Sequence, residues 1–205
     1  MDIERLGLIY SDYREKVKPL MSTINARMKG QYPDNCLNEI RAMLDHVARC
    51  YKADEEDYKE KDRIISEELS KAEGHLRRLL YDCFKQLNIL LFDAIHKVER
   101  KKFNSSWFYI SGGEFWKEYT SGLQKAVECA VDAKKNESYK PSLALTNYDK
   151  AFNSYCYVES LLLTNKKTKN CFARLRHFFE FVNTWWSWLI VTVILSLISS
   201  LIEIY

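Results

Sequence analysis

Two residues in the first quarter of the chain have side chains that could bind an anionic group and transfer a proton. Arg41 and His46 are separated by four residues in the segment that begins at Asn38. An arginine stays charged and can bind a phosphate in a bidentate manner, whereas a histidine can take up or release a proton near neutral pH. Together they could serve as phosphate binder and acid/base catalyst. Asn38 and Asp45 are the neighbouring side chains predicted to support them.

A second polar group follows about thirty residues later and has helical spacing. His75, Arg78 and Asp82 stand at positions i, i+3 and i+7, which places them on one face of a helix. We expect this stripe to face Arg41 and His46 across a pair of helices. That arrangement would form one compact polar site.

The geometry of Arg41 and His46 also allows a structural interpretation. Residues five apart on a helix point about 140° away from each other, so the two side chains do not share a face. Arg41 is four residues before Asp45, a spacing typical of an ion pair on the surface of a helix. His46 would then be an interfacial side chain without a chemical role, and both alternatives stay open.

The Arg-x4-His pattern within a helix resembles the signature of the HEPN superfamily of helical ribonucleases and toxins. The segment from Lys71 to Asp82 is similar to the one that often follows this pattern in HEPN-like bacterial proteins. The resemblance implies a helical bundle in which two copies pair, so that Arg41 and His46 of each copy meet at a cleft. It also implies that, if the chain is an enzyme, it is a metal-independent endoribonuclease; whether it is an enzyme stays open.

A candidate membrane helix occupies the C-terminus. The run from Trp185 to Ile202 has no charged residue and would be roughly 27 Å long as a helix, enough for a bilayer core. Tryptophans gather at its start, and basic residues crowd the preceding segment, 166–183. The sequence therefore predicts a transmembrane helix over 184–203 and a single-pass protein of the inner membrane, with the bulk of the chain cytoplasmic.

A polar stripe runs along this predicted span at helical spacing. Its residues are Thr192, Ser196, Ser199 and Glu203. Several copies could pack along the stripe or line a pore with it. Isolated Ser and Thr side chains also bond back to their own helix, so the stripe permits a pore without requiring one.

A helical HEPN-like domain joined to one membrane helix is similar to the small membrane-associated HEPN accessory proteins of type VI CRISPR loci. This resemblance implies an antiviral homo-oligomer that depolarises the membrane as a pore under the control of the Arg-x4-His motif. The implied partners are other copies of the chain, membrane lipid, and an RNA or a CRISPR RNA-guided nuclease. The alternatives are a membrane-tethered HEPN endoribonuclease and a membrane adaptor that recruits a soluble partner.

The elements that would position these residues are helices throughout. The chain has only six Gly and three Pro, and long stretches repeat apolar residues every three or four positions. We predict an all-α, HEPN-like bundle over 1–165, the juxtamembrane segment over 166–183 and the membrane helix over 184–203. The expected helices begin at Ile3, after the loop at 30–34, near Ile65, at Glu114 and near Leu143. Pro19 should kink the first, and the second should bury Leu37, Ile40, Leu44, Val47 and Tyr51.

No cofactor or metal follows from the sequence. The six cysteines are scattered, without a pair or a Cys/His spacing that suits zinc, and we expect reduced thiols. P-loop, zinc-protease and serine-hydrolase motifs are missing as well. A net charge of +3 supplies no field strong enough to indicate nucleic acid by itself.

Overall fold

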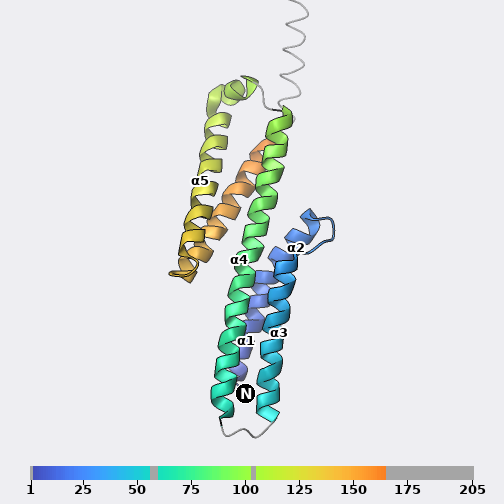
Figure 1. Ribbon diagram of the computed structural model, residues 1–205. Helices are drawn as coiled ribbons and strands as arrows, with labels where there is room; N and C mark the ends of the chain where they lie inside the picture. Colours follow the sequence, from blue (N-terminus) through green and yellow to red (C-terminus); the bar gives the residue numbers. More distant parts are fainter. Residues whose placement is uncertain (1, 56–59, 103–104, 165–205) are drawn as a thin grey trace, which may run out of the picture. The chain divides into compact units, whose positions relative to one another are not determined.

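The computed structural model describes residues 2–55, 60–102 and 105–164 of the chain. Within them every regular element is helical, which confirms the all-α prediction (Figure 1). The chain divides into two compact units, Met1–Glu159 and Ser160–Tyr205. The contacts below belong to the first unit; of the second, the described part, 160–164, is the end of a helix that begins at residue 141.

The first helical segment contains a π-helical turn just before its proline. Helix α1 (Ile3–Asp12) continues through η1 (Tyr13–Val17) into α2 (Lys18–Arg27), and the N–H of Lys18 donates to the carbonyl of Tyr13. Pro19 lacks an N–H, so a helical carbonyl one turn earlier has no donor. A wider turn just before the proline accommodates the missing bond without breaking the helix.

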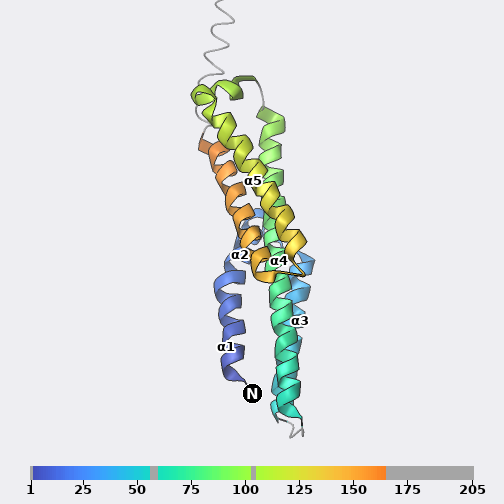
Figure 2. The same ribbon diagram turned by 90° about the vertical axis from the view of Figure 1, so that its left-hand side faces the viewer.

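Helices α3 (Asp34–Glu55) and α4 (Lys61–Lys102) form an antiparallel hairpin, which Figure 1 and Figure 2 show from two sides. The prediction for the buried face of α3 is correct in part. Ile40 and Val47 are half-buried and pack against the core, but Leu37, Leu44 and Tyr51 are exposed by 45%, 56% and 47%. The buried residues of α3 are Cys36, Met43, Cys50 and Ala53. They form one hydrophobic core with apolar side chains of α4, and polar side chains of the two helices make contact as well.

The chain turns after α4 through η2 (Ser105–Gly113) into α5 (Glu114–Asn136), and a last helix covers 141–164. Positive φ angles at Ser111, Gly112 and Gly113 reverse its direction, which explains the glycine pair. Glu137 joins these helices: its carboxylate accepts from Tyr148 at 2.5 Å and pairs with Lys85 at 2.8 Å.

The electrostatics of Glu137 follow from these contacts. Burial by itself raises the pKa of the Glu137 carboxyl, but the bonds from Lys85, Tyr148 and Lys134 outweigh it and lower that pKa to about 2. The carboxylate therefore stays charged at neutral pH, and its charge holds three helical segments together.

The membrane part of the predicted fold needs correction. In the part of the chain that the structure describes, no helix combines the length and the apolar character that crossing a bilayer requires. The prediction of a C-terminal transmembrane helix in the fold, and with it the single-pass location in the inner membrane, is therefore not supported by any helix that the structure describes. The segments 166–183 and 184–203, from which that prediction came, lie outside the described residues.

Candidate functional site

The α3–α4 interface contains two histidines stacked on each other, each held by a glutamate of the opposite helix. His46 Nδ1 lies 2.7 Å from Glu68 Oε2, and His75 Nδ1 lies 2.7 Å from Glu39 Oε2. The two imidazole rings are 5.1 Å apart at their centroids and 26° from parallel. Carboxylate, imidazole, imidazole and carboxylate thus follow one another along the hairpin. We call these four side chains the histidine ladder.

The spacing within each helix explains why the ladder forms. Glu39 precedes His46 by seven residues, and Glu68 precedes His75 by seven, so each pair lies on one helical face about two turns apart. Side chains on a helix lean toward its N-terminus. In an antiparallel hairpin, both histidines therefore lean inward and meet, whereas the glutamates lie at the two outer ends.

Arginines complete the pattern on both helices at the same spacing, Glu-x6-His-x2-Arg. The repeats are Glu39, His46 and Arg49 in α3 and Glu68, His75 and Arg78 in α4. Arg78 Nε donates to Glu39 at 3.2 Å, and Arg49 Nη1 lies 3.9 Å from Glu68. Each glutamate thus contacts a histidine and an arginine of the other helix, which gives the site an approximate two-fold symmetry.

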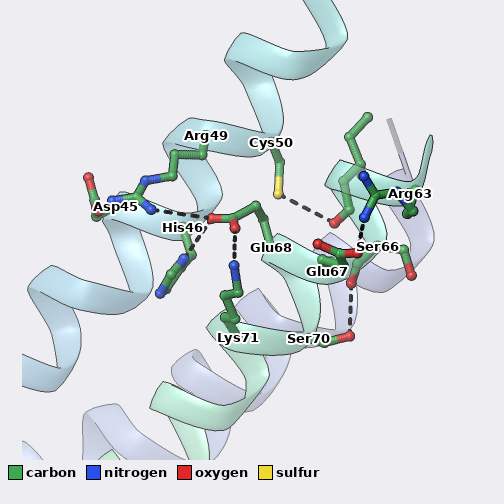
Figure 3. Close-up of polar contacts among 11 residues, drawn as sticks. Asp45, His46, Arg49, Cys50, Arg63, Ser66, Glu67, Glu68, Ser70 and Lys71 are labelled. Atoms are coloured by element: carbon green, nitrogen blue, oxygen red, sulfur yellow. Dashed lines mark hydrogen bonds and ion pairs between the residues drawn. The ribbon is translucent and has the colours of Figure 1, made fainter. Parts of the chain in front are cut away.

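Lys71 breaks this symmetry. Its ammonium donates to Glu68 Oε1 at 2.5 Å, and the equivalent position in α3 is Ala42. Figure 3 shows how Lys71, His46 and Arg49 converge on the Glu68 carboxylate from three directions. The Glu68 half of the ladder therefore has three cationic or potentially cationic partners, and the Glu39 half has two.

The electrostatic state of Glu68 reflects these neighbours. Its side chain is only 9% exposed, and burial alone raises the pKa of its carboxyl. The hydrogen bonds from His46 and Lys71 act in the opposite direction, and the net effect lowers that pKa below its usual range. Because a carboxylate only accepts, His46 donates its Nδ1 proton to Glu68, which leaves Nε2 as the ring nitrogen that can accept one.

The Nδ1 atom of His75 has two neighbours of opposite character. Arg78 Nη2 lies 2.8 Å from it, and the Glu39 carboxylate lies 2.7 Å from it. A guanidinium only donates, so this nitrogen cannot donate to Glu39 and accept from Arg78 at the same time. Glu39 therefore favours a proton on His75 Nδ1, whereas Arg78 favours that nitrogen without a proton. His46 has no such competition.

The structure separates the remaining predicted residues from His46 and His75. Arg41 is exposed and donates to Asn38 Oδ1 at 3.0 Å instead of pairing with Asp45. Asp45 pairs with Arg49 at 2.6 Å on the surface of α3. Within one chain, Arg41 is thus not part of the ladder, as its 140° separation from His46 on the helix requires.

Asp82 also lies apart from the ladder: it pairs with Lys85, 3.5 Å away on the same helix. The predicted pore stripe lies outside the described residues. Its members are Thr192, Ser196, Ser199 and Glu203. The predicted pore required the transmembrane helix over 184–203, which no described helix supports.

Four important residues of this site were missed from the sequence: Glu39, Glu68, Arg49 and Lys71. The repeated Glu-x6-His-x2-Arg spacing could have identified the first three. A search for one motif at a time did not reveal it, because each half looks like an ordinary charged helix face. Only the pairing of the two helices makes the repeat meaningful.

The ladder is not a metal-ligand set of the usual kind, since among residues 2–55, 60–102 and 105–164 no group of three or more His, Cys, Asp or Glu side chains could hold a metal ion. Known proteins add no assignment: no family model, no curated protein and no solved structure matches the chain. The resemblance to the HEPN superfamily therefore stays a prediction.

Proposed function

We propose that the chain is an endoribonuclease that uses the two histidines of the ladder as its acid and base. The observation that carries the proposal is the stacked pair His46 and His75, each bound through Nδ1 by a carboxylate of the opposite helix. A carboxylate on Nδ1 orients an imidazole and directs its Nε2 toward the reacting atoms.

The chemistry assigns one proton transfer to each ring. His46 Nε2 takes the proton of a ribose 2′-hydroxyl, whose oxygen attacks the adjacent phosphorus. The bond from phosphorus to the 5′-oxygen breaks, and protonated His75 supplies a proton to that oxygen. The products are a 2′,3′-cyclic phosphate and a free 5′-hydroxyl, and no metal takes part. His46 is assigned as the base because Glu68 accepts from its Nδ1, which leaves Nε2 able to accept a proton. His75 is therefore assigned as the acid.

The cations beside the ladder would bind the substrate phosphate. The side chains of Arg49, Lys71 and Arg78 are 56%, 52% and 54% exposed, so their charged groups reach solvent while they contact the ladder carboxylates. Arginine and lysine at such a site neutralise the charge that grows on phosphate oxygens in the transition state. The role expected for Arg41 would thus pass to Arg49 and Arg78.

The stacking limits where the RNA can bind. Rings 5.1 Å apart leave no room for a phosphate between them. The scissile phosphate must approach along the edge of the stack. His46 and His75 are 15% and 19% exposed at their side chains, so part of each ring is open to that approach.

The test measures cleavage of a single-stranded RNA by the purified chain in the presence of a chelator, with the 2′,3′-cyclic product identified. His46→Gln and His75→Gln should each lower the rate at least about 100-fold, the usual contribution of an acid or base. His96→Gln is the matched control, because His96 also binds a glutamate through Nδ1, Glu99 at 2.6 Å, but outside the ladder. Intact RNA with the wild type, or equal rates for all variants, refutes the proposal and leaves the ladder a packing device.

A further inference from the structure

A second polar site lies between α5 and the helix over 141–164, within the first unit. A groove of about 470 Å³ runs between the two helices, which is in the usual range for a small-molecule site. Gly122 allows the helices to approach here: a Cβ atom on it would come within 2.8 Å of Val158 Cγ2. The groove shares no residue with the histidine ladder.

Three pairs of facing residues line the groove at regular intervals. Glu118 and Tyr157 mark one end, where the Tyr157 hydroxyl donates to the Glu118 carboxylate at 3.1 Å. The helices are antiparallel, so moving along α5 by three and by seven residues pairs Ser121 with Ser154 and Lys125 with Lys150. The two ends are about 10 Å apart along the helix axis.

The lysine end of the groove carries two positive charges, those of Lys125 and Lys150. Neither Lys125 nor Lys150 has an ion-pair partner within the described residues, although Lys134 and Lys135 on the same α5 pair with Glu137 and Asp132. The two lysines line the same groove and could bind an anion together. Phosphate fits, because lysine binds phosphate as a point charge.

The opposite end carries different chemistry. Tyr157 is 47% exposed at this end of the groove, and an aromatic side chain of this kind can stack on a planar base. The Glu118 carboxylate beside it only accepts hydrogen bonds, so it selects groups that donate. Between the ends, the hydroxyls of Ser121 and Ser154 can donate and accept, as sugar hydroxyls require.

We propose that this groove binds a nucleoside phosphate whose base carries an exocyclic amino group. The phosphate lies between Lys125 and Lys150, the sugar beside Ser121 and Ser154, and the base against Tyr157 with its amino group directed at Glu118. The same chemistry is present in a free mononucleotide and in one nucleotide of an RNA strand. Binding here does not depend on the proposed cleavage at the ladder.

The experiment titrates adenosine monophosphate, uridine monophosphate and a short oligoadenylate into the full chain by calorimetry. Lys125→Gln combined with Lys150→Gln should weaken binding at least tenfold. The matched control combines Lys135→Gln with Lys140→Gln, which removes the same charge from exposed positions outside the groove and should change the affinity less than twofold. Glu118→Gln should reduce the preference for adenine over uracil, and circular dichroism verifies that each variant is folded.

Each outcome decides the proposal. Saturable adenosine monophosphate binding that the groove lysines control supports a free nucleotide, and binding of the oligoadenylate alone with the same dependence supports an RNA strand. An equal loss in the control variant shows general charge attraction and overturns the site. The absence of saturable binding of either ligand up to about 1 mM also overturns it. These titrations measure binding and not RNA cleavage, so a lack of binding in the groove does not refute the proposed ribonuclease activity. In the same way, a lack of cleavage does not refute binding in the groove.

Discussion

Replacing Glu68 by Gln removes the charge at the centre of the better-defined half of the ladder. The Glu68 carboxylate is bound by His46 at 2.7 Å and by Lys71 at 2.5 Å, and its side chain is 9% exposed. Glutamine has nearly the same shape, so the packing against α3 is kept. The two charge-assisted bonds become weaker. The new amide NH2 group also needs hydrogen-bond acceptors, and the site offers few.

The magnitude lies between two known limits. Removing one partner of a fully buried ion pair costs about 3–5 kcal/mol, and removing an exposed pair costs about 0–1 kcal/mol. Glu68 itself is buried, but Lys71 and Arg49 are 52% and 56% exposed, so water screens part of their interaction. We expect Glu68→Gln to lower the free energy of unfolding by about 2 kcal/mol, measured by urea unfolding followed by circular dichroism.

Glu67→Gln is the matched control in the adjacent position. Glu67 is 51% exposed and pairs with Arg63 on its own helix, so its loss should cost less than about 0.5 kcal/mol. Both variants carry the same change of charge and differ only in what the carboxylate contacts. A cost for Glu68→Gln no larger than that for Glu67→Gln would refute the electrostatic account of the ladder.

The effect of pH provides a second check with a definite sign. The folded chain holds the pKa of Glu68 below its ordinary value of 4.5, so the charged form is favoured by folding. The stability that this provides is fully present above pH 4.5 and is lost as the pH falls through the lowered pKa. Glutamine does not titrate, so the difference between wild type and Glu68→Gln should shrink in that acid range. A difference that grows there would contradict the assigned direction.

Three further predictions follow from the contacts described above. Gly122→Ala should destabilise the chain by about 1–3 kcal/mol, because its new methyl group overlaps Val158 at 2.8 Å. Gly74→Ala should instead stabilise it by up to about 1 kcal/mol, since the nearest atom to a Cβ there is 3.8 Å away and alanine favours helix; urea unfolding measures both. Glu137→Gln should lower the free energy of unfolding by about 2 kcal/mol at neutral pH. Because the pKa of Glu137 is about 2, the wild type should lose this stability as the pH falls from about 4.5 toward 2. Acid titration of the helical circular dichroism signal measures this loss.

The helices could be predicted from the sequence because their causes are local. Apolar spacing and the rarity of Gly and Pro identified the helical segments, and the starts at Ile3 and Glu114 agree with α1 and α5. The π-helical turn before Pro19 was not predicted, since a proline in a helix can be accommodated in several ways.

The buried face of α3 could be predicted only in part from hydrophobicity. Ile40 and Val47 pack against the core as expected, but Leu37, Leu44 and Tyr51 are exposed, whereas Cys36, Met43 and Cys50 are buried. Which of two adjacent stripes is buried depends on the partner helix, and no local pattern describes that partner.

The sequence by itself determined the helical class, the approximate helix limits and the two residues, His46 and His75, from which the candidate site was built. Only the tertiary structure decided that Glu39 and Glu68 hold these histidines and that Arg41 lies elsewhere. The physical reason is one of range. Helix formation depends on neighbours within one or two turns, whereas the ladder depends on the register of two antiparallel helices, which places residues 22 and 36 positions apart in hydrogen-bond contact.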